Sequence, residues 1–521
     1  MRTSQQFFDT AGRIIATIDP LGAKTSREYN PLNFVTKITD AQGGITSMTY
    51  DKNANLLTVT DARNNTTTYT YDNMDRLATR KDALLAIESY QYDGNGNRTQ
   101  FTDRRNKVTS FQYDELDRLS FIGYGTQPGP TYESTITNVY DTVNRLRQAI
   151  DSITGTITLN YDDLDRLTSE ANPQGTLSYG YDNASRRTSM TVAGQAAATY
   201  GYDDTGRTIS ISQGSSAVAF TYDAAGRRTS LTLPNAITTS YSYDAASQII
   251  GLTYATPNAK LGDLTYEYDS TGRRTTTGGS FARTGIPGAL SSATYNANNQ
   301  LTQRGGTSFS YDPNGNLATD GVTSYTWNAR NQLVGLSGAS SASFAYDAIG
   351  RRRGKTIGST TTNFLYDGFN LVQELSGSTP TANLLTGSGI DETFTRSDAG
   401  GTSSFLVDAL GSTLELSDGS GALRTHYTFE PFGATTTSGV SSTNAAQFTG
   451  RENDGTGLYF YRARYYDSSQ QRFLAEDPLA SIAASMHVTF PAARNAVIIA
   501  QPSNAYSYAN NNPISFVDPL A

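Results

Sequence analysis

The chain contains no cysteine, which excludes disulfide bonds and thiolate metal sites. Its only histidines are His426 and His487. This number excludes a His-rich metal site and argues against a catalytic triad that contains histidine. Acidic residues outnumber basic ones by 48 to 40, and the formal net charge of −8 argues against a nucleic-acid partner. Phosphate loops of the G-x-x-x-x-G-K-[ST] type are also missing. We therefore expect no cofactor, no bound metal and no metabolic activity.

Long hydrophobic runs are absent as well. No stretch is apolar and long enough to cross a membrane, and the opening residues MRTSQQFFDTAGR lack the apolar segment of a signal peptide. The lack of cysteine fits an extracytoplasmic protein that avoids oxidation, and it fits a cytosolic protein too. If the protein is exported, it uses another route or is part of a longer polypeptide.

What the chain has in abundance is a Tyr-Asp pair that returns about every 21 residues. The pair begins at Tyr50, Tyr71, Tyr92 and Tyr113, at a fixed step of 21. Later copies begin at Tyr140, Tyr161, Tyr181, Tyr202, Tyr222, Tyr243, Tyr268, Tyr311, Tyr346 and Tyr366, with degenerate copies at Phe8, Tyr29, Tyr295 and Trp327. Such self-similarity indicates an array in which each unit is stable only against its neighbours.

Each repeat is predicted to contain two strands and two turns. In residues 66–77, TTTYTYDNMDRL, Thr and Tyr alternate, which is typical of a strand. The fourth residue after the Tyr is mostly Gly, Asn or Asp, as at Gly96, Asn33 and Asp75, and these residues tolerate the positive φ of a turn. A second turn, such as Asp61-Ala-Arg-Asn, lies in the middle of the repeat. The sequence thus predicts one β-hairpin per repeat.

The predicted fold class is all-β. At about 4.8 Å per strand, an open sheet of roughly 36 strands would be on the order of 170 Å wide. Sheets of that width curl or split, because twisted open sheets rarely exceed about 10 strands. We therefore expect the hairpins to wind into a spiral sheet. Two packed sheets or a filled β-solenoid remain alternatives, since periodicity does not separate a hollow spiral from a filled one.

The repeats over residues 1–375 resemble the YD (RHS) repeats of bacterial RHS proteins, whose pattern is Y-D-x-x-G-R-L. This family includes polymorphic toxins, toxin-complex C components and cell-wall-associated contact toxins, and animal teneurins carry related repeats. After a Gly/Ser-rich junction at 376–404, residues 405–521 resemble the RHS repeat-associated core domain. The motifs that carry this second resemblance are DALGS from Asp408, HYTFEPFG from His426, FTGRE from Phe448, TGLYFYRARYYD from Thr456, RFLAEDP from Arg472, NAYSYANNNP from Asn504 and DP from Asp518.

The resemblance implies a hollow β-sheet shell, or cocoon, that is closed by the core domain. In this family the shell encloses a variable C-terminal effector until delivery. The implied function is a structural container of a bacterial polymorphic toxin system, in a secreted or cell-surface location. Its partners would be a C-terminal toxin segment, absent from this chain, and components of a secretion or toxin-delivery machine.

The resemblance also implies a catalytic site. In toxin-complex relatives the core domain is an intramolecular aspartic protease, and its two Asp and supporting Arg fall on Asp477, Asp518 and Arg464. Two neighbouring carboxylates do not both ionise easily, so one could activate water while the other, protonated, polarises the scissile carbonyl. Alternatively, both Asp-Pro units open ordinary turns and Arg464 is a packing residue.

The chain departs from the family pattern near both aspartates. Ala480 and Ala521 stand where the family has Gly in its two D-P-x-G units, and an insert at 481–503 separates the two aspartates. The insert is partly apolar and is either a short element inside the shell or a surface excursion. Both an active and an inactive protease are compatible with these departures.

Two other functions compete with the container. Exposed Tyr rings could stack on sugars, as in an extracellular protein that binds cell walls or carbohydrate, although packing ladders explain the same residues. A truncated copy without cargo is the third possibility. His426 lies in the strand-like segment 424–429 and is interpreted as a strand residue rather than a catalytic one.

Overall fold

The computed structural model describes residues 3–126, 131–289, 292–478 and 504–518. Within these ranges the regular structure consists of β-strands and two short 3-10 segments, η1 (Phe448–Gly450) and η2 (Ala509–Asn511). The predicted all-β fold class is confirmed.

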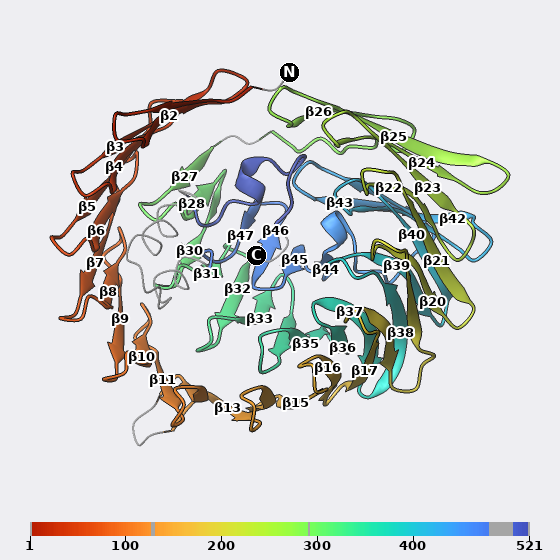
Figure 1. Ribbon diagram of the computed structural model, residues 1–521, viewed down its shortest axis with the longest axis horizontal. Helices are drawn as coiled ribbons and strands as arrows, with labels where there is room; N and C mark the ends of the chain where they lie inside the picture. Colours follow the sequence, from red (N-terminus) through yellow and green to blue (C-terminus); the bar gives the residue numbers. More distant parts are fainter. Residues whose placement is uncertain (1–2, 127–130, 290–291, 479–503, 519–521) are drawn as a thin grey trace.

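The chain up to Gly278 forms one antiparallel sheet of 26 strands, the outer winding, in which each strand pairs with the next. Figure 1 shows this sheet curving around the molecule until its last strands return to the first. At this seam Ser270 Oγ donates a hydrogen bond to the carbonyl oxygen of Pro20 at 3.3 Å. The strands are β1 (Gln5–Phe8), β2 (Ile14–Ile18), β3 (Lys24–Tyr29), β4 (Val35–Thr39), β5 (Ile45–Tyr50), β6 (Leu56–Thr60), β7 (Thr66–Tyr71), β8 (Leu77–Lys81), β9 (Ile87–Tyr92), β10 (Arg98–Thr102), β11 (Val108–Tyr113), β12 (Leu119–Tyr124), β13 (Ser134–Tyr140), β14 (Leu146–Asp151), β15 (Gly155–Tyr161), β16 (Leu167–Asn172), β17 (Gly175–Tyr181), β18 (Arg187–Val192), β19 (Ala198–Tyr202), β20 (Thr208–Gln213), β21 (Ser216–Tyr222), β22 (Arg228–Thr232), β23 (Thr238–Tyr243), β24 (Ile249–Ala255), β25 (Lys260–Tyr268) and β26 (Arg274–Gly278).

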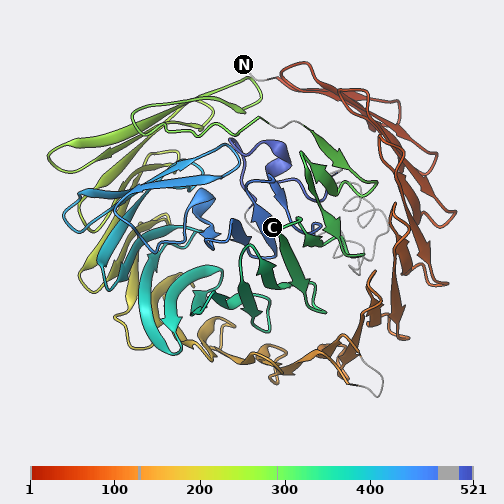
Figure 2. The same ribbon diagram turned by 180° about the vertical axis from the view of Figure 1, so that it is seen from behind.

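The rest of the chain lies inside the outer winding, as both views show (Figures 1 and 2). A three-stranded and a 14-stranded sheet form the inner winding, and a four-stranded sheet lies at the centre. The strands of the inner winding are β27 (Ala293–Tyr295), β28 (Leu301–Arg304), β29 (Thr307–Ser308), β30 (Ser310–Tyr311), β31 (Leu317–Thr319), β32 (Thr323–Trp327), β33 (Leu333–Gly338), β34 (Ala342–Tyr346), β35 (Arg352–Ile357), β36 (Thr360–Asp367), β37 (Asn370–Ser376), β38 (Thr379–Thr386), β39 (Thr393–Asp398), β40 (Gly401–Val407), β41 (Thr413–Ser417), β42 (Leu423–Phe429) and β43 (Thr435–Gly439). The central strands are β44 (Glu452–Asn453), β45 (Leu458–Tyr461), β46 (Arg464–Asp467) and β47 (Arg472–Phe473). The 14-stranded sheet runs without a break through the junction at 376–404.

The repeat turn is closed by the Asp of the Tyr-Asp pair. In one copy, Asp162 Oδ1 accepts hydrogen bonds from the backbone N–H groups of Leu164 and Arg166 at 2.9 and 3.0 Å, and Asp162 Oδ2 accepts one from Arg166 Nε at 2.7 Å. Arg166 then reaches the next repeat, where Nη1 donates to the carbonyl oxygen of Asp182 at 2.9 Å and the guanidinium lies 4.9 Å from the ring centre of Tyr181. We call this arrangement the turn clamp. It recurs in repeats that have arginine at this position, such as those of Arg76 and Arg145, and it links those hairpins to their successors.

The repeat tyrosines complete the link between hairpins. The hydroxyl of Tyr161 donates to the carbonyl oxygen of Leu146 at 3.0 Å, and that of Tyr181 donates to Leu167 at 2.7 Å. Each of these tyrosines stands at a β-bulge, where the register shifts by one residue against the return strand. Bulges increase local twist, and one per hairpin gives the sheet a regular curvature.

Positive φ occurs where the sequence predicts it, with one exception. Asn33, Asp75 and Gly96 have φ of 66°, 57° and 93°. In the copy that begins at Tyr366, however, the positive φ falls on Gly368 (58°), and Asn370 pairs directly with the strand residue across from it. Because Gly368 turns the chain two residues earlier, Asn370 is the first residue of β37 rather than the turn residue that its spacing predicts.

The wall is one sheet thick where the outer winding begins. In β3 and β4 every side chain remains at least partly exposed, so within the described parts of the chain no second layer buries either face of these strands. By contrast, all five residues of β41 in the inner winding are buried. This arc of the wall excludes the alternative of two packed sheets for the start of the array.

The outer winding contacts the inner winding through ion pairs near the ends of strands, of which the first below is buried and the second partly exposed. Arg330 Nη1 contacts Asp151 Oδ2 at 2.5 Å, and Arg187 Nη1 contacts Asp367 Oδ2 at 2.6 Å. A single apolar cluster also joins the two windings and the centre, with members such as Leu177, Leu365 and Tyr461. Residues that are far apart in sequence are thus held in one body around the central strands.

Candidate functional site

The candidate site is built on the central strands. Arg464 is the first residue of β46, and its side chain is only 2% exposed. Its guanidinium carbon lies 3.7 Å from the ring centre of Phe473 on β47, and Nη1 donates to the carbonyl oxygen of Ala505 at 2.9 Å. The ring and the carbonyl fix the direction in which Nη2 points.

The structure brings the three predicted site residues together. Arg464 Nη2 lies 3.3 Å from Asp477 Oδ2 and 3.2 Å from Asp518 Oδ2. The two carboxylates come from segments 41 positions apart in the sequence and share one guanidinium nitrogen. Their side chains are 20% and 29% exposed, so water reaches them while Arg464 is buried.

The electrostatics of this cluster are those of a buried cation with two acidic partners. Burial lowers the pKa of Arg464, and the charges of Asp477 and Asp518 act against that shift. The cluster places two carboxylates and one buried guanidinium next to accessible water, and these are the groups that acid–base chemistry on a carbonyl requires. Pro519 and the alanines at 480 and 521 lie outside the described residues, as does the insert at 481–503.

Arg451 of the FTGRE motif also contacts the site, although the sequence does not predict a role for it. Its Nη2 donates to the carbonyl oxygen of Asp518 at 3.3 Å and also pairs with Asp391 Oδ2 at 3.1 Å. The FTGRE motif contains Arg451, but no sequence pattern pairs it with Asp391 on the junction. Through this contact the backbone at Asp518 is tied to the inner winding.

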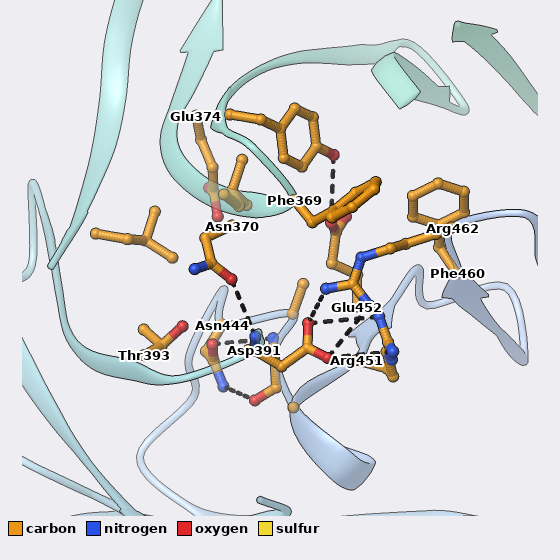
Figure 3. A pocket seen from close by; sticks show the side chains of 16 residues that line it. Phe369, Asn370, Glu374, Asp391, Thr393, Asn444, Arg451, Glu452, Phe460 and Arg462 are labelled. Atoms are coloured by element: carbon orange, nitrogen blue, oxygen red, sulfur yellow. Dashed lines mark hydrogen bonds and ion pairs between the residues drawn. The ribbon is translucent and has the colours of Figure 1, made fainter. Parts of the chain in front are cut away.

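A pocket lies around Asp391 beside the site (Figure 3). Arg462 Nη2 contacts Asp391 Oδ1 at 2.6 Å, next to Arg451. Burial raises the pKa of Asp391, and the two arginines act against this shift. Phe369 and Asn444 complete the wall that Figure 3 labels around this ion cluster. The pocket acid is therefore neutralised by two arginines of the core.

Several of the repeat tyrosines are covered on one ring face by an arginine. The guanidinium carbons of Arg145 and Arg186 lie 5.0 and 4.8 Å from the ring centres of Tyr161 and Tyr202. A sugar that stacked on those faces would have to displace the arginine. Among the described residues, no group of three His, Cys, Asp or Glu side chains is close enough to hold a metal ion. The described part of the chain also contains no helix that is long and apolar enough to span a membrane.

Comparison with known proteins supports the resemblance seen in the motifs. The chain matches the Teneurin YD-shell family over residues 64–167, 130–276 and 235–514, and the RHS Repeat family over residues 8–45. It is 30% identical over 276 residues to the tRNA nuclease WapA of Bacillus subtilis (strain 168), a match that covers 49% of this chain and 11% of that protein. It is 26% identical over 257 residues to the Double-stranded DNA deaminase toxin A of Burkholderia cenocepacia (strain H111), covering 40% of this chain and 16% of that protein.

Solved structures share the fold. A crystal structure of TcdB2-TccC3-Cdc42 has a TM-score of 0.75 at 17% identity, and it covers 100% of this chain and 34% of that chain. The Photorhabdus luminescens Tc holotoxin pore has a TM-score of 0.74 at 16% identity, with 99% of this chain and 33% of that chain covered. The chain thus spans about a third of these structures and a smaller part of its curated relatives. With family matches along most of its length, this chain belongs to the Teneurin YD-shell family of RHS/YD-repeat proteins.

Proposed function

We propose that this chain is the shell of a polymorphic toxin, which encloses a C-terminal effector and frees it by cutting its own chain. Relatives named as a tRNA nuclease and as a double-stranded DNA deaminase toxin support the toxin system, and each matches this chain over only part of its own length. The single observation that carries the release step is the meeting of Asp477 and Asp518 on Arg464. The wound sheet around a core supports the role of container.

In the proposed reaction, water attacks the carbonyl carbon of a peptide bond downstream of Asp518. The ionised member of the aspartate pair takes a proton from the water, and the protonated member donates one to the carbonyl oxygen. Collapse of the tetrahedral intermediate breaks the C–N bond and passes a proton to the leaving amine. The products are a carboxylate on the shell and a free amino terminus on the effector. Arg464 keeps both acids in place and stabilises negative charge as it develops.

Cleavage is tested with the chain extended past Ala521 by its native downstream segment. We expect the wild type to yield two fragments, and Asp477→Asn or Asp518→Asn to yield one, because an amide neither takes nor supplies the proton. Asp467→Asn is the matched control, since this buried carboxylate bonds Ser469 instead of Arg464. Mass spectrometry of the purified products reads the result, and an intact wild-type chain would reject the release step.

Enclosure is a separate claim with its own measurement. The segment downstream of Ala521 should resist an added protease when it is attached to the folded shell, and it should be digested once the shell is unfolded. Digestion of that segment at the same rate in both states would reject the container. We place the protein outside the cytoplasm by analogy with toxins of this type, with delivery components as its further partners. Binding of carbohydrate by the repeats gains no support from the arginine-covered tyrosines.

A further inference from the structure

One turn of the outer winding reaches the residue that precedes Asp477. Between β10 and β11, Arg104 forms a two-pronged ion pair with Glu476, with Nη1–Oε1 at 3.0 Å and Nη2–Oε2 at 2.7 Å. The two residues are 372 positions apart, and their side chains are 6% and 14% exposed. Paired, charge-assisted bonds of this kind fix the orientation of both partners.

Arg104 is itself held firmly in the outer winding. Its Nη1 pairs with Asp82 Oδ2 at 2.7 Å, its Nη2 donates to the carbonyl oxygen of Asn314, and Glu88 Oε2 lies 3.9 Å from Nε. Burial acts to lower the pKa of Arg104, but the neighbouring carboxylates, led by Glu476, raise it overall. Without this guanidinium, Asp82, Glu88 and Glu476 would repel one another at a buried contact.

Glu476 is enclosed from the other side by the inner winding. The hydroxyl of Tyr506 donates to the carbonyl oxygen of Gly315 at 2.7 Å and lies 3.5 Å from Glu476 Oε1. Gly315 has φ +84°, and a Cβ at this position would lie 2.5 Å from the same Oε1. The outer winding, the inner winding and the core therefore meet on one carboxylate.

Asp477 is the next residue after Glu476, and its carboxylate pairs with Arg464. Because consecutive Cα atoms are about 3.8 Å apart, fixing Glu476 restrains the backbone from which Asp477 projects. We infer that Arg104 is a positioning residue for Asp477, acting through Glu476, so that the candidate site is complete only when the outer winding has docked on the core. Release would then be restricted to shells that have finished folding. This inference rests on the proposed self-cleavage.

The test compares Arg104→Met and Arg104→Lys in the chain with its native downstream segment. We expect Arg104→Met to slow cleavage at least tenfold while the shell stays folded, and Arg104→Lys to restore part of the rate, because a lysine supplies the charge without the two-pronged geometry. Arg63→Met is the matched control. Arg63, which is exposed, also joins an outer turn to the inner winding, but its partners there are Asn296 and Asn299 and not Glu476.

Glu476→Gln covers the case in which Arg104→Met fails to fold, since it keeps the shape of the side chain. It should slow cleavage at least tenfold with the melting temperature of the shell within a few degrees of the wild type. Cleavage at the wild-type rate by a folded Arg104→Met variant would overturn the inference. If that variant does not fold, cleavage at the wild-type rate by Glu476→Gln would overturn it. In either case the proposed protease would stand. Equal slowing by Arg63→Met would also overturn it, because the effect would then be general to winding contacts. An uncleaved wild type would overturn both proposals.

Discussion

At the scale of single residues, arginine has two distinct roles in this protein. In the turn clamps it lies near the surface and pairs with an aspartate four positions earlier, as Arg166 does with Asp162. Between layers it is buried, as at Arg352 on β35, whose side chain is fully buried between Glu452 and Asp454 of the core. Its guanidinium carbon also lies 4.2 Å from the ring centre of Phe460. Surface pairs contribute little to stability, but a buried pair that loses one member leaves an uncompensated charge.

This difference gives a prediction for Arg352→Met. The substitution leaves the buried Asp454 with Lys355 Nζ at 2.9 Å, and it removes the ion pair of the partly buried Glu452. We expect the free energy of unfolding to fall by about 3–5 kcal/mol, measured by guanidinium denaturation. Arg424→Met is the control, because Arg424 is 56% exposed in its pair with Asp418 and its loss should change stability by less than about 1 kcal/mol. Equal effects of the two substitutions would show that burial does not govern these pairs.

At the scale of elements, the hairpin is the unit that responds to pH. The backbone N–H of Arg186 and then its side chain hold the pKa of Asp182 below its usual 3.8, and Arg227 does the same for Asp223. A carboxyl whose pKa is lowered on folding contributes stability that is present above its unfolded pKa and is lost as the pH falls through the folded value. The buried Asp408 has the opposite shift, because burial raises its pKa. Acid therefore removes the stability that Asp182 and Asp223 contribute to the outer hairpins. It does not remove stability at the buried Asp408 of the inner winding.

The double substitution Asp182→Asn and Asp223→Asn tests this linkage. Asparagine still closes the turn but loses the ion pair, so the variant should be less stable than the wild type at pH 7, and the difference should shrink at pH 2, which is below the usual carboxyl pKa of 3.8. Asp163→Asn, at an exposed position of a comparable turn, should behave as the wild type at both values. Denaturation midpoints at the two pH values read the result. A loss of the same size at pH 2 would mean that the amide perturbs the turn itself.

At the scale of the whole molecule, the sequence predicts the hairpins that recur along the chain, but not the single contacts between windings. The alternation of Thr and Tyr and the turn residues predict the hairpins, because these signals are local and recur. The meeting of Asp477 and Asp518 was carried by motifs of the family resemblance. No sequence signal predicts the pairing of Arg104 with Glu476, because the contact does not recur from repeat to repeat and its two residues lie 372 positions apart. Contacts between windings depend on how far each hairpin rotates the sheet, and a small change per repeat adds up over 26 strands.

The layered burial predicts a gradient of local stability through the shell. Strands β1 to β4 have only Ala16 fully buried, whereas β39 to β41 bury most of their side chains. Local opening is easiest where few apolar side chains are covered and where a strand lies at the edge of its sheet. Hydrogen exchange should therefore be fastest in residues 5–39 and slowest in residues 393–417, with the strands β14 to β22 between them. Uniform protection across the three regions would mean that the windings open as one cooperative unit, and the wall at β1 would then owe its stability to contacts other than burial.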